Sequence, residues 1–188
     1  MNEPKHCTAD DLHRGLPTIL AAPADGGRLA AIVIRSAEDQ RQCLESCRLT
    51  AARGVEGDRW AAGSWLTTDD GQPHPDVQVS LINTRLIELL AGGRERWELA
   101  GDNLCVDLDL SRANLPTGQR LAIGEAILEI TEPLHKGCGK FAQRYGPAAV
   151  RFVNSEEGLT LRLRGVYAKV VQDGLVAVGD MARKVARV

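Results

Sequence analysis

The sequence is poor in aromatic side chains, with only two phenylalanines, two tyrosines and three tryptophans among 188 residues. Proteins that bind single-stranded nucleic acids stack bases on aromatic side chains, so this class is disfavoured. The chain also lacks an excess of one charge, because 23 Lys and Arg face 25 Asp and Glu, for a formal net charge of −2. Without a broad basic surface for phosphate backbones, we expect no nucleic-acid partner.

Long hydrophobic runs are absent too, since no segment approaches the roughly 20 apolar residues of a membrane span. We therefore expect no membrane partner. The first apolar stretch, 16–22, is short, contains Pro17 and follows acidic residues, unlike a signal peptide. Five cysteines without the spacing of a disulfide framework indicate reduced thiols. These features predict a cytoplasmic protein.

The remaining pattern is that of short strands. Hydrophobic residues alternate with polar ones over 77–81, 104–110 and 166–170, and the segments 121–123 and 128–130 read as a hairpin around Gly124-Glu125. The apolar run 29–34 and the segment 181–188 predict further strands, whereas 38–52 is ambiguous between helix and strand.

Helical signals are fewer. Asn83 is an N-cap candidate for a helix ending at Gly92-Gly93, a short helix is expected near Cys138, and another at Pro147. About seven strands with a few short helices favour a mainly β fold, a closed barrel, over a doubly wound sheet. We expect residues 1–27 to form an irregular N-terminal arm, with a weak capping box at Thr8, and 28–188 to form the barrel domain.

Five glycine-containing segments stand out by their order and spacing. They are Gly-Val-Glu-Gly-Asp-Arg (54–59), Gly-Asp-Asn-Leu (101–104), Gly-Cys-Gly-Lys (137–140), Arg-Gly-Val-Tyr (164–167) and Val-Gly-Asp (178–180). The ordered set resembles the MOSC domain family, named for the C-terminal domain of molybdenum cofactor sulfurases. The resemblance extends from about residue 29 to residue 188.

The resemblance implies a closed barrel similar to the small barrel domain of pyruvate kinase. It also implies a site for the molybdenum cofactor (Mo-pterin), or for a sulfur cargo, centred on one cysteine that carries sulfur or coordinates molybdenum. Cys138 occupies the matching position and is the expected catalytic residue and metal ligand. Pyridoxal phosphate enters only as a family association, through a desulfurase domain that some members carry.

The residues around Cys138 are compatible with that role. Glycines on both sides allow a sharp turn and close approach of a ligand. His135, Lys136 and Lys140 lie within three residues, and nearby positive charge favours a thiolate, which can ligate a soft metal or carry a persulfide. The structural alternative is a buried inert thiol, because Cys138 also starts a helical stripe through Phe141.

The expected cofactor-binding residues are Asp58, Arg59, Asn103, Lys140 and Arg164. Asp58 and Arg59 either shape an anion pocket or form an ordinary turn with a solvated arginine. Asn103 offers a hydrogen-bonding edge to a pterin or simply opens a strand. Arg164 suits a phosphate, unless it is a surface charge.

Two positions depart from the family pattern, and one of them is Asp102, where family members frequently carry glutamate. Family members often carry a histidine directly after the Asp-Arg pair, where this chain has Trp60, and His74 stands nearby as a replacement or as an exposed loop histidine.

Among the other thiols, Cys43 and Cys47 are four residues apart, which predicts a shared face and a structural role. Cys105 falls on the polar register of its strand and is expected to be partly exposed.

Two mechanisms follow from the resemblance. In one, Cys138 coordinates molybdenum and the protein reduces N-hydroxylated compounds with an external electron donor, because the sequence shows no flavin, haem or iron–sulfur motif. In the other, Cys138 carries a persulfide supplied by a separate cysteine desulfurase and delivers the sulfur. The alternative from another class is a non-catalytic module that binds a cofactor or a protein partner and has an inert cysteine.

Overall fold

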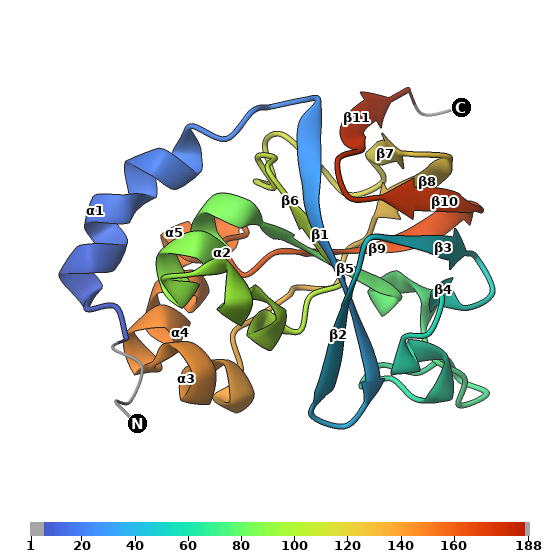
Figure 1. Cartoon of the computed structure of the whole chain (residues 1–188), viewed down its shortest axis with the longest axis horizontal. Helices are drawn as coiled ribbons and strands as arrows, with labels where there is room; N and C mark the ends of the chain where they lie inside the picture. Colours follow the sequence, from blue (N-terminus) through green and yellow to red (C-terminus); the bar gives the residue numbers. More distant parts are fainter. Residues whose placement is uncertain (1–5, 187–188) are drawn as a thin grey trace.

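The computed structural model describes residues 6–186 and has a closed seven-stranded β-barrel at its centre (Figure 1). Around the barrel the order is β1, β6, β5, β9, β8, β7 and β11, which pairs back onto β1. The expected mainly β barrel with a few helices is therefore confirmed. The barrel strands are β1 (Gly27–Ala37), β5 (Val79–Asn83), β6 (Leu104–Val106), β7 (Arg120–Ile123), β8 (Ala126–Ile130), β9 (Val166–Gln172) and β11 (Met181–Val185).

Four further strands extend this framework, and two of them, β2 (Gln40–Leu44) and β3 (Ser46–Thr50), lie in the segment 38–52 that the sequence left ambiguous. β2 forms a hairpin with the far end of β1. A separate three-stranded sheet has the order β10 (Gly174–Ala177), β3 and β4 (Gly54–Val55). The ambiguous segment is therefore largely extended.

One strand pair of the barrel, β5 and β6, is parallel, with Leu81 opposite Leu104. Parallel neighbours need a long crossover, which α2 (Thr84–Ala91) and the 3-10 helix η3 (Arg94–Ala100) provide. The Asn83 side chain accepts hydrogen bonds from the first turn of α2, and Gly92 ends the helix at φ 68°. The predicted helix after Asn83 is thus confirmed with its cap.

The α-helices gather on one side of the barrel (Figure 1). The predicted short helices after Cys138 and at Pro147 are present as α3 and α4. A hydrophobic core fills the barrel, and a second core lies between the outer surface of β1, β5 and β6 and the helices. The helices other than α2 are α1 (Ala9–Leu20), α3 (Gly139–Tyr145), α4 (Pro147–Asn154) and α5 (Glu156–Thr160).

The expectation of an irregular arm over 1–27 is wrong for most of the described part of that segment, because α1 occupies twelve of its residues. Thr8 and Asp11 form a reciprocal capping box, and Pro17 lies inside the helix. Proline removes one helical hydrogen bond, but Leu12 and Ile19 are buried in the second core. Burial of this amphipathic face stabilises the helix despite the proline. Residues 1–5 of the expected arm lie outside the described residues.

The expectations for three cysteines are also corrected. Cys105 is only 1% exposed, because the helical layer covers the outer face of β6 that period-2 alternation marks as the solvent face. Cys43 and Cys47 lie on different strands, β2 and β3, so they share no face; the first is exposed and the second buried. Within 6–186, no helix has both the length and the apolar character needed to cross a membrane.

A buried polar network joins β1 to the turn after β4. The Asp58 carboxylate accepts hydrogen bonds from the backbone N–H, Nε and Nη2 of Arg35 at 2.8–2.9 Å, and from the Trp60 N–H at 2.9 Å. Asn103 donates to the same carboxylate at 3.0 Å, and its Oδ1 accepts from the Ser80 N–H at 3.1 Å. Five donors on one carboxylate fix the Arg35 guanidinium in place.

The charge of Asp58 is retained in this network. Burial alone would raise the pKa of Asp58, but the hydrogen bonds and positive charge of Arg35 outweigh it and hold the pKa below its ordinary value. Asp58 therefore contributes stability that is complete above the unfolded-state pKa of about 3.9. That contribution is lost as the pH falls through the lower pKa of the folded state.

Replacing Gly165 with alanine should destabilise the barrel strongly. Gly165 has φ +109°, and an added Cβ would lie only 2.2 Å from the Leu81 carbonyl oxygen on the neighbouring strand. We expect Gly165→Ala to lower the free energy of unfolding by about 2–4 kcal/mol in urea titrations. Gly63→Ala is the control, because its Cβ would meet nothing within 4 Å and its backbone is extended. Equal free energies of unfolding for Gly165→Ala and Gly63→Ala would contradict the inferred clash at Gly165.

Asp58→Asn should reduce stability in a pH-dependent way. At pH 7 and pH 5 the change leaves Arg35 without its counter-charge, and we expect a loss of roughly 3 kcal/mol. The difference in the free energy of unfolding from the wild type should narrow below about pH 4, because the Asp58 carboxylate of the unfolded chain becomes protonated there whereas the folded-state pKa is lower. It should be lost as the pH falls through that folded-state pKa. Urea unfolding at pH 7, 5 and 3 measures this, with Asp69→Asn, an exposed loop carboxylate, as control. A difference in the free energy of unfolding that stays constant from pH 7 to pH 3 would contradict the charged state of Asp58 in this network.

Candidate functional site

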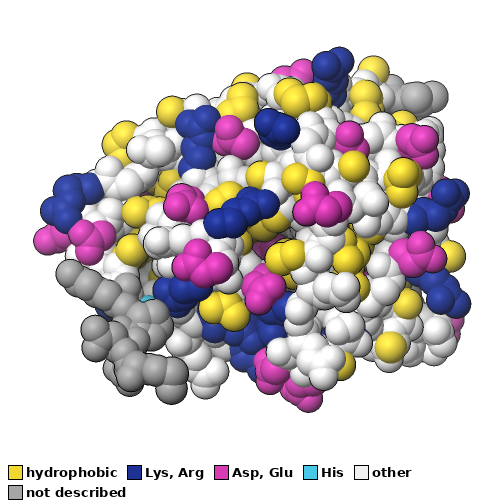
Figure 2. Space-filling view, viewed as in Figure 1, with side chains coloured by type: hydrophobic (Ala, Val, Ile, Leu, Met, Phe, Trp, Pro, Cys, Tyr) yellow, Lys and Arg dark blue, Asp and Glu magenta, His cyan; other side chains and the backbone are white. Residues whose placement is uncertain are grey.

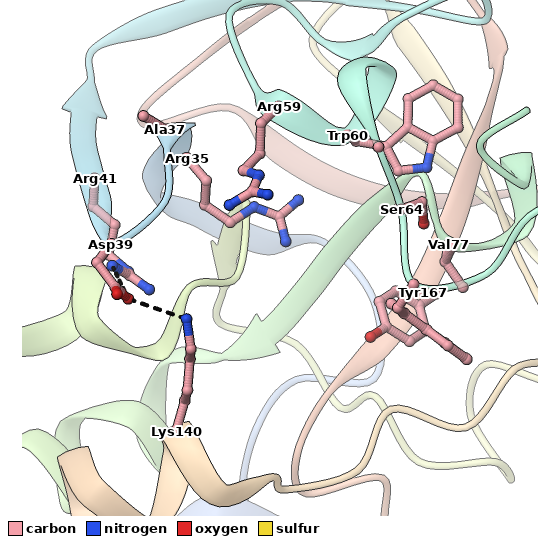
Figure 3. A pocket seen from close by; sticks show the side chains of 12 residues that line it. Arg35, Ala37, Asp39, Arg41, Arg59, Trp60, Ser64, Val77, Lys140 and Tyr167 are labelled. Carbon is pink, nitrogen blue, oxygen red and sulfur yellow. Dashed lines mark hydrogen bonds and ion pairs between the residues drawn. The ribbon is translucent and has the colours of Figure 1, made fainter.

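A pocket of about 410 Å³ opens between the β1–β2 hairpin, the 3-10 helix η1 (Arg59–Ala62), α3 and β9. Figure 3 shows its two sides. Four basic side chains form one side, and aromatic side chains form the other. The basic residues are Arg35, Arg41, Arg59 and Lys140; the aromatic residues, which we call the aromatic wall, are Trp60, Trp65 and Tyr167.

The basic side is only partly neutralised. Lys140 pairs with Glu38 and Asp39 of the hairpin tip at 3.3 and 3.4 Å. Among the described residues, Arg41 has one distant ionic contact, 4.0 Å to Asp39, and its buried Nε has no hydrogen-bond partner. Burial and the positive charge of Arg144 lower the pKa of Arg41, an effect that Asp39 opposes. Figure 2 shows Lys and Arg side chains gathered between α3 and this hairpin, beside acidic side chains at its tip.

Arg59 adds a positive charge in the middle of the pocket. Its guanidinium lies next to that of Arg35 (Figure 3). Within 6–186, Arg59 makes no ion pair, whereas Arg35 is compensated by Asp58. Guanidinium and ammonium groups with free donors bind carboxylate or phosphate oxygens. The basic side therefore has the donor set of an anion site.

The aromatic wall contains a buried donor and an exposed ring. Trp60 is 7% exposed, and its indole N–H has no hydrogen-bond partner among the described residues. Trp65 is 67% exposed, and its ring centroid lies 6.2 Å from that of Tyr167 at a tilt of 44°. Three of the few aromatic residues of this chain thus meet in a single pocket.

A buried cluster of charged residues lies behind Tyr167. The His135 ring stacks on Tyr167 with centroids 4.3 Å apart, and its Nδ1 is 3.4 Å from Oδ1 of Asp102. The other oxygen of Asp102 accepts a 2.6 Å hydrogen bond from Arg164, which also donates to the Ala100 carbonyl. Burial raises the pKa of Asp102 although Arg164 opposes this. Burial and the nearby arginines lower the pKa of His135 well below its ordinary value, so the imidazole is neutral at pH 7.

Cys138 does not line the pocket, but it lies in the segment that leads to the pocket residue Lys140. It is exposed and occupies the N-cap position of α3, two residues before Lys140. The preceding Gly137 is fixed on both its N–H and carbonyl by the Asn154 side chain, at 2.8 and 2.9 Å. The segment 135–140 begins at His135, stacked on a pocket residue, and ends at Lys140, which lines the pocket. Since two residues span at most about 7 Å, Cys138 is close to Lys140.

The structure brings some of the predicted residues together and separates others. Arg59 and Lys140 line the pocket. Asp58 and Asn103 lie in the buried network and contact the pocket through Arg35. Arg164 lies behind the pocket and is paired with Asp102. The roles predicted for these residues in binding a cofactor remain predictions.

The structure also fixes the position of His74 and limits the possible metal ligands. His74 is the N-cap of the 3-10 helix η2 (Pro75–Val77), where its ring accepts a hydrogen bond from the Asp76 N–H at 3.2 Å. In the described part of the chain, no group of three or more His, Cys, Asp or Glu side chains could hold a metal ion. A metal in this pocket would therefore depend on Cys138 and on ligands that the metal brings with it.

Sequence reasoning missed Arg35, Arg41, Trp65 and Tyr167 as pocket residues. Arg35 directly follows the apolar run 29–34, so a charge at the end of a buried strand was an available signal. Trp65 stands in a Gly-Ser-Trp loop of an aromatic-poor chain, where an exposed ring indicates a contact surface. Arg41 gave no signal, because its position depends on the hairpin geometry.

Comparisons with known proteins agree with this architecture. The YuaD protein from Bacillus subtilis is 18% identical with a TM-score of 0.62, over 86% of this chain and 97% of that one. YiiM from Escherichia coli is 20% identical with a TM-score of 0.55, over 86% and 71% of the two chains. YiiM from Geobacillus stearothermophilus is 15% identical with a TM-score of 0.56, over 86% and 76%. At these identities the likeness shows a common fold.

A search of curated proteins gives no match, and none of the comparisons supports a link to pyridoxal phosphate. The model of the MOSC domain matches residues 74–183, more than half of the chain. This stretch includes Asn103, Cys138 and Arg164, and ends within β11, which closes the barrel. The chain belongs to the MOSC domain family.

Proposed function

We propose that the pocket binds a molybdenum–pterin cofactor, with Cys138 as the protein's sulfur ligand to the metal. The observation that carries the proposal is the partly uncompensated basic side of a 410 Å³ pocket, one of whose lining residues, Lys140, is two residues from the exposed Cys138. The family, whose members bind molybdenum cofactor in general, supports the choice of ligand.

The residues present fit such a group. The cofactor carries a phosphate, and the donors available to it are the unpartnered Nε of Arg41, the Arg59 guanidinium and the Lys140 ammonium. The pocket volume is within the range of small-molecule sites. Thiolate sulfur is a soft ligand that suits metals bound by other sulfur donors. Arg41 and Lys140 would hold the anionic end, and Cys138 would hold the metal.

The activity that we propose is the reduction of N-hydroxylated compounds. When bound, the cofactor supplies two-electron chemistry at the metal. The reaction consumes two electrons and two protons, breaks the N–O bond and yields an amine and water. The electrons come from a separate electron-transfer protein. The chain's own residues bind the anion, and the Asn154 contacts to Gly137 fix the loop that carries Cys138.

The pocket also bears on the two alternatives. A sulfur carrier needs an accessible thiol, but it does not need a hollow with uncompensated guanidinium groups next to that thiol. A non-catalytic module with an inert cysteine predicts a buried thiol, whereas Cys138 is exposed. Both observations favour a cofactor ligand over a carrier or a structural residue.

The metal content of the purified protein tests the binding proposal. Protein from cells that make the cofactor should contain molybdenum and pterin, and Cys138→Ser should lower the molybdenum content at least tenfold because serine oxygen is a poorer soft-metal ligand. Cys43→Ser is the matched control, since Cys43 is exposed but lies on β2. Elemental analysis and pterin fluorescence measure both components. Equal molybdenum in the wild type and Cys138→Ser would overturn the ligand assignment.

Reduction of a simple N-hydroxylated compound tests the activity. With reduced methyl viologen as the donor, loaded wild-type protein should convert benzamidoxime to benzamidine. Cys138→Ser should lose at least 95% of the rate, roughly the effect of removing a metal ligand, and Cys43→Ser should retain it. A persulfide on Cys138 after incubation with a cysteine desulfurase, together with no reduction, would support the carrier mechanism instead.

A further inference from the structure

The aromatic wall is not used by the proposed cofactor contacts, and it is the most unusual surface of the chain. Trp65 is the most exposed of the large hydrophobic side chains in 6–186. Exposing an indole to water is unfavourable, so a ring held open beside a pocket indicates a surface that a ligand covers. The nearby cations restrict what that ligand is.

The available face of the wall can be identified. Tyr167 has one face covered by His135, with ring centroids 4.3 Å apart, and its other neighbour is Trp65 at 6.2 Å. Because Trp65 is 67% exposed, much of its indole stays accessible despite the contact with Tyr167. A ligand ring that packs there contacts Trp65 and the edge of Tyr167.

Two polar groups define the rest of the ligand. The Trp60 indole N–H is a buried donor without a partner in the described residues, and Figure 3 shows it directed toward Ser64, another residue that lines the pocket. A buried donor without a partner costs free energy, which a ligand acceptor recovers. Arg59, the residue before Trp60 on η1, supplies a guanidinium without an ion pair in the described part of the chain.

From this arrangement we propose that the pocket selects planar aromatic anions as substrates. The ring packs against Trp65, an acceptor atom meets the Trp60 N–H, and a carboxylate or phosphate substituent pairs with Arg59. The inference rests on the proposed function in one respect: it assigns Arg41 and Lys140 to the cofactor and leaves Arg59 to the substrate. It reassigns Arg59, which the sequence analysis placed among the cofactor-binding residues.

Calorimetric titration of the full chain with four probes distinguishes the contribution of the aromatic ring to binding from that of the anionic group. The probes are 1-naphthyl phosphate, cyclohexyl phosphate, inorganic phosphate and uncharged 1-naphthol. We expect 1-naphthyl phosphate to bind at least tenfold more tightly than the other three, because only it engages both the indole and the guanidinium. If cyclohexyl phosphate or inorganic phosphate binds as tightly, the aromatic subsite does not exist and the proposal is overturned.

Variants test whether the ligand binds at the aromatic wall. Trp65→Leu should weaken 1-naphthyl phosphate threefold to tenfold while leaving inorganic phosphate unchanged, and Trp65→Phe should retain most of the affinity. Arg59→Gln should weaken both phosphates, whereas Arg53→Gln, an exposed arginine on the β3–β4 turn, should change nothing. Because Trp65 is exposed, its replacement should leave the thermal unfolding unchanged, which calorimetry of the same samples verifies. Unchanged affinity in Trp65→Leu would overturn the proposal.

The same titration on molybdenum-loaded protein distinguishes substrate from cofactor. If the loaded protein still binds 1-naphthyl phosphate, the wall serves a substrate, as proposed. If binding falls in proportion to the molybdenum content, the wall holds the pterin ring and the substrate assignment is overturned. Failure of the cofactor proposal is a separate result: no molybdenum would be found, while the ring and charge preferences of the metal-free protein would persist.

Discussion

The carboxylate of Asp58 is the interaction on which the site depends. It receives five hydrogen bonds from three separate segments: Arg35 at the end of the barrel strand β1, Trp60 on η1, and Asn103 at the entrance to β6. Two of these segments also contact each other directly, since the Val33 N–H donates to the Asn103 carbonyl at 2.8 Å. The buried charge of Asp58 links the basic side of the pocket to the first residue of the aromatic wall. Without it, the partly buried Arg35 would lose its counter-charge, a more costly arrangement than the pair.

Positive charges are crowded together on one side of the pocket at a free-energy cost. Arg41 has its pKa lowered by burial and by neighbouring arginines, and its Nε lacks a partner. Folded proteins tolerate such an arrangement where surrounding structure enforces it, often at sites of function. Here the barrel, the β1–β2 hairpin and α3 hold the basic side chains close together.

Much of the fold could be predicted from the sequence because local patterns matched the tertiary environment. Period-2 alternation located β7, β8 and β9, whose outer faces are partly exposed, and Asn83 with Gly92 bounded α2. The predictions failed where the helical layer covers a barrel strand and buries its outer face. Cys105 lies on the outer face of a barrel strand that the helices cover, so alternation misplaced it. The full length of helix α1 was not predicted, because Pro17 disfavours a helix interior and the capping signal at Thr8 is short.

The candidate site was less accessible to sequence reasoning. Motif order singled out Arg59 and Lys140, which line the pocket, and Cys138, which lies two residues before Lys140. Arg35, Arg41 and Tyr167 are brought there by a hairpin and by strand register, which depend on pairing between distant segments. Arg164 looked available in the sequence, but its guanidinium is occupied by Asp102 from a turn 62 residues earlier.

The two-point attachment of Gly137 to Asn154 has a consequence for how chemistry proceeds at the neighbouring sulfur. Both backbone polar groups of that residue are bonded to Asn154 of α4, which itself packs in the second core, so the loop has little freedom to move. The sulfur next to this residue is therefore carried by a fixed backbone. A reaction at Cys138 requires the reactant to move to the thiol, because the loop cannot carry the thiol far.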